Sequence, residues 1–342
     1  MGKGLGLLGY DTAIDLGTAN TRIYVRGQGL VLDEPSVVAV QNGKVVAAGA
    51  EARRMIGRTP MGVRVQRPLR DGVIADFSLA RRMLRIFLLR VQRWGRLVRP
   101  RVAITVPCGA TVVERRAVEE AAFAAGARSV HLVDVPLAAA IGCGLAIEEP
   151  AAVLVADIGA GATDVAIISM GGMVTSHTAR TGGDALDHAL AAHVRSEHAM
   201  LVGEVTAEEA KTGLTGADGK AVIRGRYAAT GLPGTLKLPY EEVQAAMAEP
   251  IGLIVHAVRL ALEICPPELS GDLMDRGLVL TGGGAVTAGL SERLREDTDL
   301  PVQAADDPLA AVVLGAARHL EDLDMFGGTW RKTRRTAPVA AF

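Results

Sequence analysis

The chain has 342 residues, of which 49% are hydrophobic and 22% are charged, and its formal net charge is −1 at pH 7. This length exceeds one ordinary hydrophobic core, so we expect two lobes, and the composition excludes a large disordered region. The near-neutral charge argues against nucleic acid as a partner, and three cysteines without a C-x-x-C pair argue against a disulfide framework or a cysteine zinc site.

The sequence shows no targeting or membrane-spanning segment. Every apolar run is broken by a charge before it reaches the ~20 residues that a membrane helix needs, as Asp157 breaks the run from Ala151. Residues 1–10 contain one lysine and too little apolar length for a secretion signal. We therefore expect the protein to stay in the cytoplasm.

The first predicted element is a β-hairpin over Ile14–Val25, with the sequence I-D-L-G-T-A-N-T-R-I-Y-V. Apolar residues on both sides of a turn with glycine, threonine and asparagine are typical of two short strands. The strand before the turn carries a carboxylate, Asp15. More polar, glycine-containing sequence follows, and we expect residues 39–70 to form a small subdomain.

A basic stretch runs from Phe77 to Val113 without any acidic residue. Met83, Phe87 and Val91 recur at helical spacing, which predicts the buried face of an amphipathic helix. Around Trp94 lie the arginines Arg81, Arg82, Arg85, Arg90, Arg93, Arg96, Arg99 and Arg101. A basic loop with an aromatic residue suits an anionic membrane surface, where each cation contributes ~1 kcal/mol. The alternative is a merely solvated basic face.

Strands and helices alternate in the rest of the first half. The pattern predicts a strand, a helix, a strand and a helix, in this order: Arg101–Val106, Thr111–Ala125, Ser129–Val133 and Pro136–Ile141. Thr111 is followed three residues later by Glu114, which is the pattern of an N-terminal capping box. Such alternation favours α/β lobes whose sheets are covered on both faces.

A second hairpin over Val155–Ile168, V-A-D-I-G-A-G-A-T-D-V-A-I-I, repeats the first one. Three positions correspond between the copies: Asp15 and Asp157, Gly17 and Gly159, Thr21 and Thr163. Two copies of one hairpin predict two lobes of related topology.

The repeat suggests how the chain divides into domains. We place the first lobe at residues 1–147 plus 309–342 and the second at 148–308, with a second small subdomain at about 183–239. In the second lobe, a strand at Gly277–Leu280 leads into a third glycine-rich turn and a helix. Residues 327–342 are basic and aperiodic, and we expect them to be a flexible tail.

The two hairpin turns have the features of a phosphate clamp. Successive backbone N–H groups in a turn rich in Gly, Thr and Ala form a concave nest for phosphate oxygens. A carboxylate repels phosphate, so Asp15 and Asp157 make sense if Mg²⁺ or its water shell lies between the anions. Alternatively, the glycines only permit tight turns. No G-x-x-x-x-G-K-[ST] motif occurs, which excludes a Walker-type phosphate loop.

Further motifs extend over nearly the whole chain. They are I-D-L-G-T-A-N-T at Ile14–Thr21, L-D-E-P-S-V-V-A at Leu32–Ala39, G-R-T-P at Gly57–Pro60, D-G-V-I-A-D-F at Asp71–Phe77, V-E-R-R at Val113–Arg116, G-G-D at Gly182–Asp184, C-P-P-E-L at Cys265–Leu269 and L-T-G-G-G-A at Leu280–Ala285. With these motifs the chain resembles the MreB/Mbl family of bacterial actin homologues, in the actin, Hsp70 and sugar kinase superfamily.

The resemblance implies an actin-like ATPase fold of the α/β class, with two related, ribonuclease H-like lobes and a nucleotide cleft between them. It implies ATP and Mg²⁺ as cofactors and self-assembly into filaments. It also implies an anionic inner membrane surface, met by a loop around Arg93, Trp94 and Arg96, and cell-wall synthesis or morphogenesis proteins as partners. The expected location is the cytoplasm, peripherally at the inner face of the cell membrane, and the expected role is cell shape.

The resemblance also implies a set of nucleotide-binding positions. Carried over residue by residue, they are Asp15, Gly17, Thr18, Ala19, Asn20, Asp157, Gly159, Ala160, Gly161, Gly183, Asp184, Glu208, Lys211, Gly282, Gly283, Gly284 and Ala285. By the resemblance, Asp15 and Asp157 hold Mg²⁺ through water, and Glu208 and Lys211 help to bind adenosine. Without it, Glu208 and Lys211 would be interpreted as an exposed helix pair.

Two departures from the family fall on the catalytic side. Val135 stands where the family usually has a glutamate that helps to position the attacking water, and Ala162 stands where it has an assisting threonine. Neither side chain offers a hydrogen bond, and such help is commonly worth ~10²-fold in rate. We therefore predict that ATP is bound but hydrolysed slowly or not at all, and we assign no catalytic residue. The alternative is that Asp134 has taken over this role.

A third departure is Ala160, which replaces a usual glycine and matters only if that position needs a positive φ.

The main alternative function is a sugar-kinase-like phosphotransferase on the same fold, for which no compelling catalytic carboxylate is found. A chaperone of the Hsp70 kind is disfavoured because no substrate domain follows the lobes.

Overall fold

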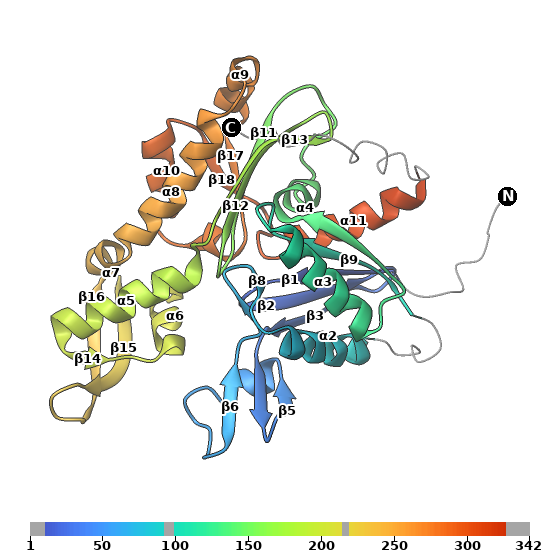
Figure 1. The fold of residues 1–342 in the computed structure, drawn as a ribbon. Helices are drawn as coiled ribbons and strands as arrows, with labels where there is room; N and C mark the ends of the chain where they lie inside the picture. Colours follow the sequence, from blue (N-terminus) through green and yellow to red (C-terminus); the bar gives the residue numbers. More distant parts are fainter. Residues whose placement is uncertain (1–10, 92–98, 214–218, 326–342) are drawn as a thin grey trace.

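The computed structural model describes residues 11–91, 99–213 and 219–325. Its first sheet has the strand order β10-β9-β1-β2-β3 (Figure 1). The strands are β1 (Thr12–Leu16), β2 (Asn20–Val25), β3 (Gly29–Pro35), β9 (Arg101–Val106) and β10 (Ser129–Asp134). The first three strands form an antiparallel meander, and β9 and β10 continue the sheet in parallel with β1.

The second sheet repeats this topology, with the order β13-β12-β11-β17-β18. Its strands are β11 (Val153–Ile158), β12 (Thr163–Ser169), β13 (Gly172–Ala179), β17 (Leu278–Thr281) and β18 (Val302–Ala304). Again three strands form an antiparallel meander and the last two run parallel with the first. The repeated hairpin therefore belongs to a repeat of the whole five-stranded sheet, which confirms two lobes of related topology.

Two helices lie between the sheets and join the lobes (Figure 1). α4 (Val135–Gly142) packs on β10, β11 and β12, while α11 (Ala311–Met325) packs on β1, β2 and β9. Each helix presents a glycine to the other: a Cβ atom at Gly142 would overlap the Ala311 carbonyl oxygen, and one at Gly315 would overlap that of Ala138. A close contact between two helices therefore sets the relative placement of the lobes.

The outer face of the first sheet is covered by α2 (Phe77–Val91) and α3 (Val112–Ala125). Met83 and Phe87 on α2 are fully buried, as the helical spacing predicted. The capping box is confirmed as well, because the Thr111 hydroxyl accepts the Glu114 backbone N–H and the Glu114 carboxylate accepts that of Thr111 at 2.8 Å. These local patterns thus determine where the helices begin and which face they bury.

The second lobe carries further helices. They are α5 (Gly183–His198), α8 (Ala248–Glu263), α9 (Pro267–Arg276) and α10 (Leu290–Thr298), and the short 3₁₀ helix η1 (Gly283–Val286) follows β17. α8 packs on β12 and β13, and its apolar side chains join those of the sheet in one core.

Two small sheets extend from the lobes (Figure 1). The first has the order β5-β4-β6 and is built from β4 (Val38–Gln41), β5 (Lys44–Ala48), β6 (Val63–Gln66) and the helix α1 (Ala50–Arg53). The second has the order β14-β15-β16 and is built from β14 (Met200–Leu201), β15 (Lys220–Tyr227), β16 (Pro233–Pro239), α6 (Glu204–Thr212) and α7 (Tyr240–Ala246). A short ladder, β7 (Leu69–Arg70) with β8 (Val73–Ile74), completes the first half.

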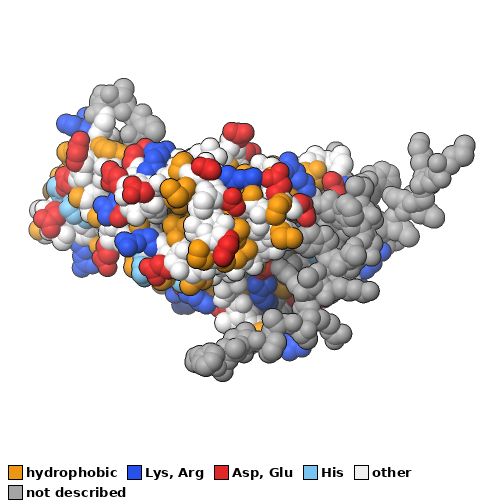
Figure 2. Space-filling model, turned by 90° about the horizontal axis from the view of Figure 1, so that it is seen from above, with side chains coloured by type: hydrophobic (Ala, Val, Ile, Leu, Met, Phe, Trp, Pro, Cys, Tyr) orange, Lys and Arg blue, Asp and Glu red, His pale blue; other side chains and the backbone are white. Residues whose placement is uncertain are grey.

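In the described part of the chain, no single helix is long and apolar enough to cross a membrane, and α7 and α8 pass that test only together, as a pair bent by 61°. Acidic and basic side chains are interspersed on the face shown in Figure 2. The predicted membrane residues Arg93, Trp94 and Arg96, and the predicted tail at 327–342, lie outside the described residues.

Candidate functional site

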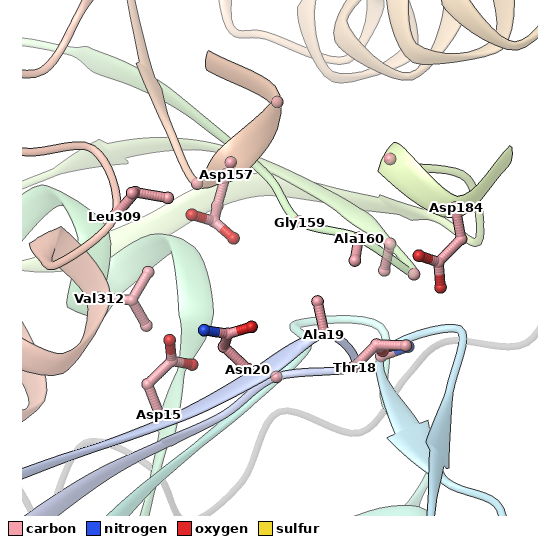
Figure 3. A pocket seen from close by; sticks show the side chains of 18 of the residues that line it. Asp15, Thr18, Ala19, Asn20, Asp157, Gly159, Ala160, Asp184, Leu309 and Val312 are labelled. Carbon is pink, nitrogen blue, oxygen red and sulfur yellow. The ribbon is translucent and has the colours of Figure 1, made fainter. Parts of the chain in front are cut away.

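A cavity of about 300 Å³ lies between the lobes, at the turn ends of the two hairpins (Figure 3). This volume is at the lower end of the ~300–1,000 Å³ typical of small-molecule sites. Every predicted nucleotide-binding residue lines the cavity except Ala285, which is buried in η1 between the lining residues Gly284 and Val286. Residues that are far apart in the sequence are thus brought to one place.

The two hairpin turns have the same geometry. Gly17 N–H donates to the Asn20 carbonyl at 3.1 Å, and Gly159 N–H donates to the Ala162 carbonyl at 2.9 Å. Each hydrogen bond closes a two-residue turn, so the sequence repeat is also a structural repeat. Ala160 is not among the described residues with positive φ, so its replacement of a glycine causes no backbone strain.

Two glycines let other segments approach the second turn closely. A Cβ atom at Gly161 would lie 2.5 Å from Thr18 Oγ1, so a larger residue would push the two hairpins apart. Thr18 Oγ1 also accepts the Gly72 N–H at 3.0 Å, which ties the first turn to the loop before β8. On the other side, a Cβ atom at Gly284 would overlap the Ile158 side chain. The third glycine-rich turn can therefore lie directly on the second hairpin.

Asp15 and Asp157 lie on opposite walls, and Figure 3 shows their carboxylates directed toward the space between them. Thr105 Oγ1 donates to Asp15 at 3.1 Å, and Thr281 Oγ1 donates to Asp157 at 2.7 Å. Burial raises the pKa of both groups, that of Asp157 to about 7, and the charge of Asp15 adds to the rise for Asp157. Arg22, 3.7 Å from Asp15, compensates only in part.

These two carboxylates fit a divalent cation. A buried carboxylate with a raised pKa gains most from a positive charge, and Mg²⁺ is bound by carboxylate oxygens or through its water shell. The cavity offers both carboxylates from opposite lobes together with turns suited to phosphate. The arrangement is therefore suited to a metal-bound polyphosphate.

Glu208 and Lys211 do not form an exposed helix pair, because each contacts a different element. Glu208 forms an ion pair of 2.6 Å with Arg53 of α1. Lys211 Nζ lies 2.8 Å from Asp187 Oδ1 and donates to the Gly183 carbonyl at 3.0 Å, which links α6 to α5. The interpretation as an exposed pair was therefore wrong, and both residues belong to the cavity wall.

Val135 and Ala162 also line the cavity and are only 9% and 6% exposed. Asp134 is not among the lining residues. It is buried, and its carboxylate accepts a hydrogen bond from Arg115 at 2.5 Å. This placement disfavours Asp134 as a substitute for the missing glutamate.

Sequence reasoning missed several lining residues, among them Arg53, Arg67, Asp164, Asp187, Leu309 and Val312. Asp164 is buried and accepts hydrogen bonds from the Cys108 N–H at 2.9 Å and from Thr178 Oγ1 at 2.5 Å. Burial raises the pKa of Asp164. Its position directly after the repeated Thr163 was the one available signal. The other five belong to no repeated motif.

Comparisons with known proteins agree with this geometry. The family model described as "MreB/Mbl protein" matches residues 9–327. The chain belongs to the MreB/Mbl family. Among MreB/Mbl relatives, it is 47% identical to the cell shape-determining protein MreB of Escherichia coli strain K12, over 94% of this chain and 96% of that protein. It is 44% identical to the cell shape-determining protein Mbl of Bacillus subtilis strain 168, over 92% of this chain and 96% of that protein.

Solved structures of the MreB/Mbl family share the fold. The structure of MreB5 of Spiroplasma citri bound to AMPPNP superposes with a TM-score of 0.87 at 33% identity, over 93% of this chain and 99% of that chain. The same protein has also been solved with ADP. The expected actin-like, two-lobed fold is thereby confirmed.

Proposed function

We propose that the protein is an ATP-binding, actin-like cytoskeletal protein that forms membrane-associated filaments in the cytoplasm and organises cell-wall synthesis and cell shape. The observation that carries the proposal is the pair of matched hairpin turns with two half-buried aspartates on opposite walls of one cavity. The bacterial relatives named for cell shape and the relative solved with AMPPNP and ADP support it. A sugar-kinase-like phosphotransferase gains no comparable support.

In this proposal the polyphosphate lies between the two turns, with the backbone N–H groups of residues 18–20 and 160–161 directed at its oxygens. Mg²⁺, when bound, neutralises charge between phosphates and carboxylates. Asp15 and Asp157 would hold the ion through water, and their half-buried, raised-pKa carboxylates would gain from its charge. Because the two aspartates come from different lobes, their joint hold on one ion would draw the lobes together.

The adenosine end lies toward Glu208, Lys211 and the third turn at 282–284. Lys211 acts mainly by positioning α6 against α5, through Asp187 and the Gly183 carbonyl. Ala285 supports the turn from behind rather than forming its surface.

Two ion pairs cross the cleft between the small subdomains. Arg53 pairs with Glu208 and Arg67 pairs with Glu204, each at 2.6 Å. The four side chains are 24–42% exposed, so each pair contributes ~1 kcal/mol or less. We propose that they assist closure over the nucleotide without preventing its release.

We also propose that ATP hydrolysis is slow or absent. Val135 and Ala162 place apolar groups on the cavity wall, while Asp134 and Asp164 are already held by neighbouring donors. A water molecule near the terminal phosphate would then lack a well-placed base.

The test of this function is sedimentation of the full chain with electron microscopy of the pellet. Filaments are expected with ATP and Mg²⁺, with strong reduction when EDTA replaces Mg²⁺ or when Asp157 is changed to Asn. A chain that binds Mg·ATP but shows no filaments at any protein concentration would contradict the cytoskeletal function. ATP-dependent phosphorylation of sugars by the same preparation would favour the phosphotransferase.

A further inference from the structure

A cluster of metal-type donor groups lies outside the nucleotide cavity. His193 and His198 are on α5, and Glu242 is on α7. His193 Nε2 lies 3.0 Å from Glu242 Oε1, and His198 Nε2 lies 2.5 Å from the same oxygen. The donor atoms of the three residues all lie within 4.8 Å of one another, and none of the three residues lines the cavity.

The local structure explains why these side chains converge. His198 is the last residue of α5, and Ala199 ends the helix with a left-handed φ of 48°. Glu242 lies in the first turn of α7, and Figure 1 shows that helix beside α5, with which it is in contact. The two imidazole rings meet edge to face, with centroids 6.1 Å apart and an interplanar angle of 65°. Their Nε2 atoms can therefore approach one carboxylate oxygen.

We propose that His193, His198 and Glu242 form a binding site for a divalent transition metal of the Zn²⁺ type. Two imidazole nitrogens and a carboxylate are a donor set that Zn²⁺ uses, with a fourth position left for water. Zinc ligands lie ~2.0–2.1 Å from the ion, so tetrahedral ligand atoms are about 3.3 Å apart. The two His–Glu separations, 3.0 and 2.5 Å, are shorter than that value, so the side chains would move slightly apart to admit an ion.

The position of the cluster also suits an ion from solution. The three side chains are 24%, 28% and 29% exposed, so an ion reaches the site without opening the core. Mg²⁺ prefers oxygen ligands, and nitrogen donors therefore separate this site from the aspartates of the cavity. A bound ion would join the end of α5 to the start of α7, at the base of the second small sheet.

The experiment is zinc titration calorimetry of the full chain saturated with Mg·ADP, so that the cavity carboxylates are already occupied. One Zn²⁺ per chain is expected. Loss of a residue that only hydrogen-bonds to a metal ligand typically weakens metal binding ~10-fold. His198→Ala and Glu242→Gln remove proposed ligands themselves, so each should weaken zinc binding by at least that factor. His188→Ala is the matched control, because His188 is an exposed histidine of the same helix that does not belong to the cluster.

Cobalt absorption gives a second measurement that needs no variant. Co²⁺ added to the wild-type chain should give the strong visible bands of a tetrahedral site, which one equivalent of Zn²⁺ removes. Absence of zinc binding at concentrations on the order of 100 μM would overturn the proposal. Equal zinc affinity of the His188 and His198 variants would overturn it too, since the three groups would then form only a hydrogen-bonded cluster. Retained Mg·ADP binding verifies that each variant is folded.

Discussion

At the scale of single residues, the cavity combines groups that bind charge with side chains that offer no hydrogen bond. Asp15 and Asp157 are half-buried with raised pKa values and gain from a cation, whereas Val135 and Ala162 form an apolar part of the wall. Asp164, a buried carboxylate of the wall, is held by Cys108 and Thr178. This division suits retention of a metal-bound nucleotide better than its turnover.

Hydrogen-bonding side chains at positions 135 and 162 should raise the rate of ATP hydrolysis. For Val135→Glu combined with Ala162→Thr, we expect phosphate release on the order of 10²-fold faster than wild type, because water gains a base and a second partner. The matched control is Val135→Gln with Ala162→Val, which keeps similar volumes without the carboxylate and hydroxyl. Ordinary ATPase turnover by the wild type would contradict the argument.

The raised pKa of Asp157 predicts a pH-dependent affinity for Mg·ATP. At pH values below the Asp157 pKa of about 7, this carboxyl holds a proton that the metal must displace. The affinity for Mg·ATP should therefore fall about tenfold per pH unit toward pH 5.5. By the same linkage, the unbound protein loses stability as pH rises from about 4 to 7, because the unfolded chain releases this proton first. Fluorescent nucleotide titrations from pH 5.5 to 8 measure the first effect. A flat profile for wild type, or an unchanged slope in Asp157→Asn, would exclude Asp157 as its source.

At the scale of elements, the contact between α4 and α11 places the two lobes. Gly142 and Gly315 allow each helix to approach the backbone of the other. The sequence alone predicted α4 nearly to its ends, because Pro136 and the small residues after it are local signals. Its partner helix carries no comparable signal, since packing against a distant segment depends on the folded chain.

A pair of glycine substitutions tests this contact. Gly315→Ala should destabilise the protein by ~1–3 kcal/mol, because its Cβ would overlap the Ala138 carbonyl. Gly252→Ala on α8 is the matched control, since a Cβ atom there meets nothing within 4 Å. The control should be neutral or stabilise by ~0.5–1 kcal/mol through helix propensity. Urea unfolding measures the free energy of unfolding of both variants. Similar free energies for the two would show that the contact between α4 and α11 does not set stability.

At the scale of the whole molecule, we expect two lobes that bound nucleotide holds together and a basic segment that contacts the membrane. Arg81 and Arg85 of α2 are exposed, whereas Arg82 donates to the Gly43 carbonyl and Arg90 pairs with Glu34. Half of the arginines on this helix are thus engaged within the first lobe. If the protein binds a membrane, we expect the attraction to come mainly from the basic sequence that follows α2.

Liposome flotation tests this contact. Trp94→Ala with Arg93→Gln and Arg96→Gln should reduce binding to anionic vesicles about 30-fold, since two cations contribute ~1 kcal/mol each. Neutral vesicles should bind neither protein. Arg116→Gln is the control, because Arg116 is an exposed arginine of α3 outside this segment. Equal flotation of the triple variant and wild type would leave the basic segment as an ordinary solvated face.

Short stretches of sequence were enough to predict the duplicated hairpins, the capping box of α3 and the buried face of α2, and the predicted nucleotide-binding residues, Ala285 excepted, line one cavity. Each is encoded over a few neighbouring residues, in turn chemistry, helical spacing or a contiguous motif. The folded chain was needed to show that Asp134 is held by Arg115, that Glu208 pairs with Arg53, and that the two histidines of α5 meet Glu242. These pairs join segments far apart in sequence, and they form only where the packed helices and sheets place their backbones.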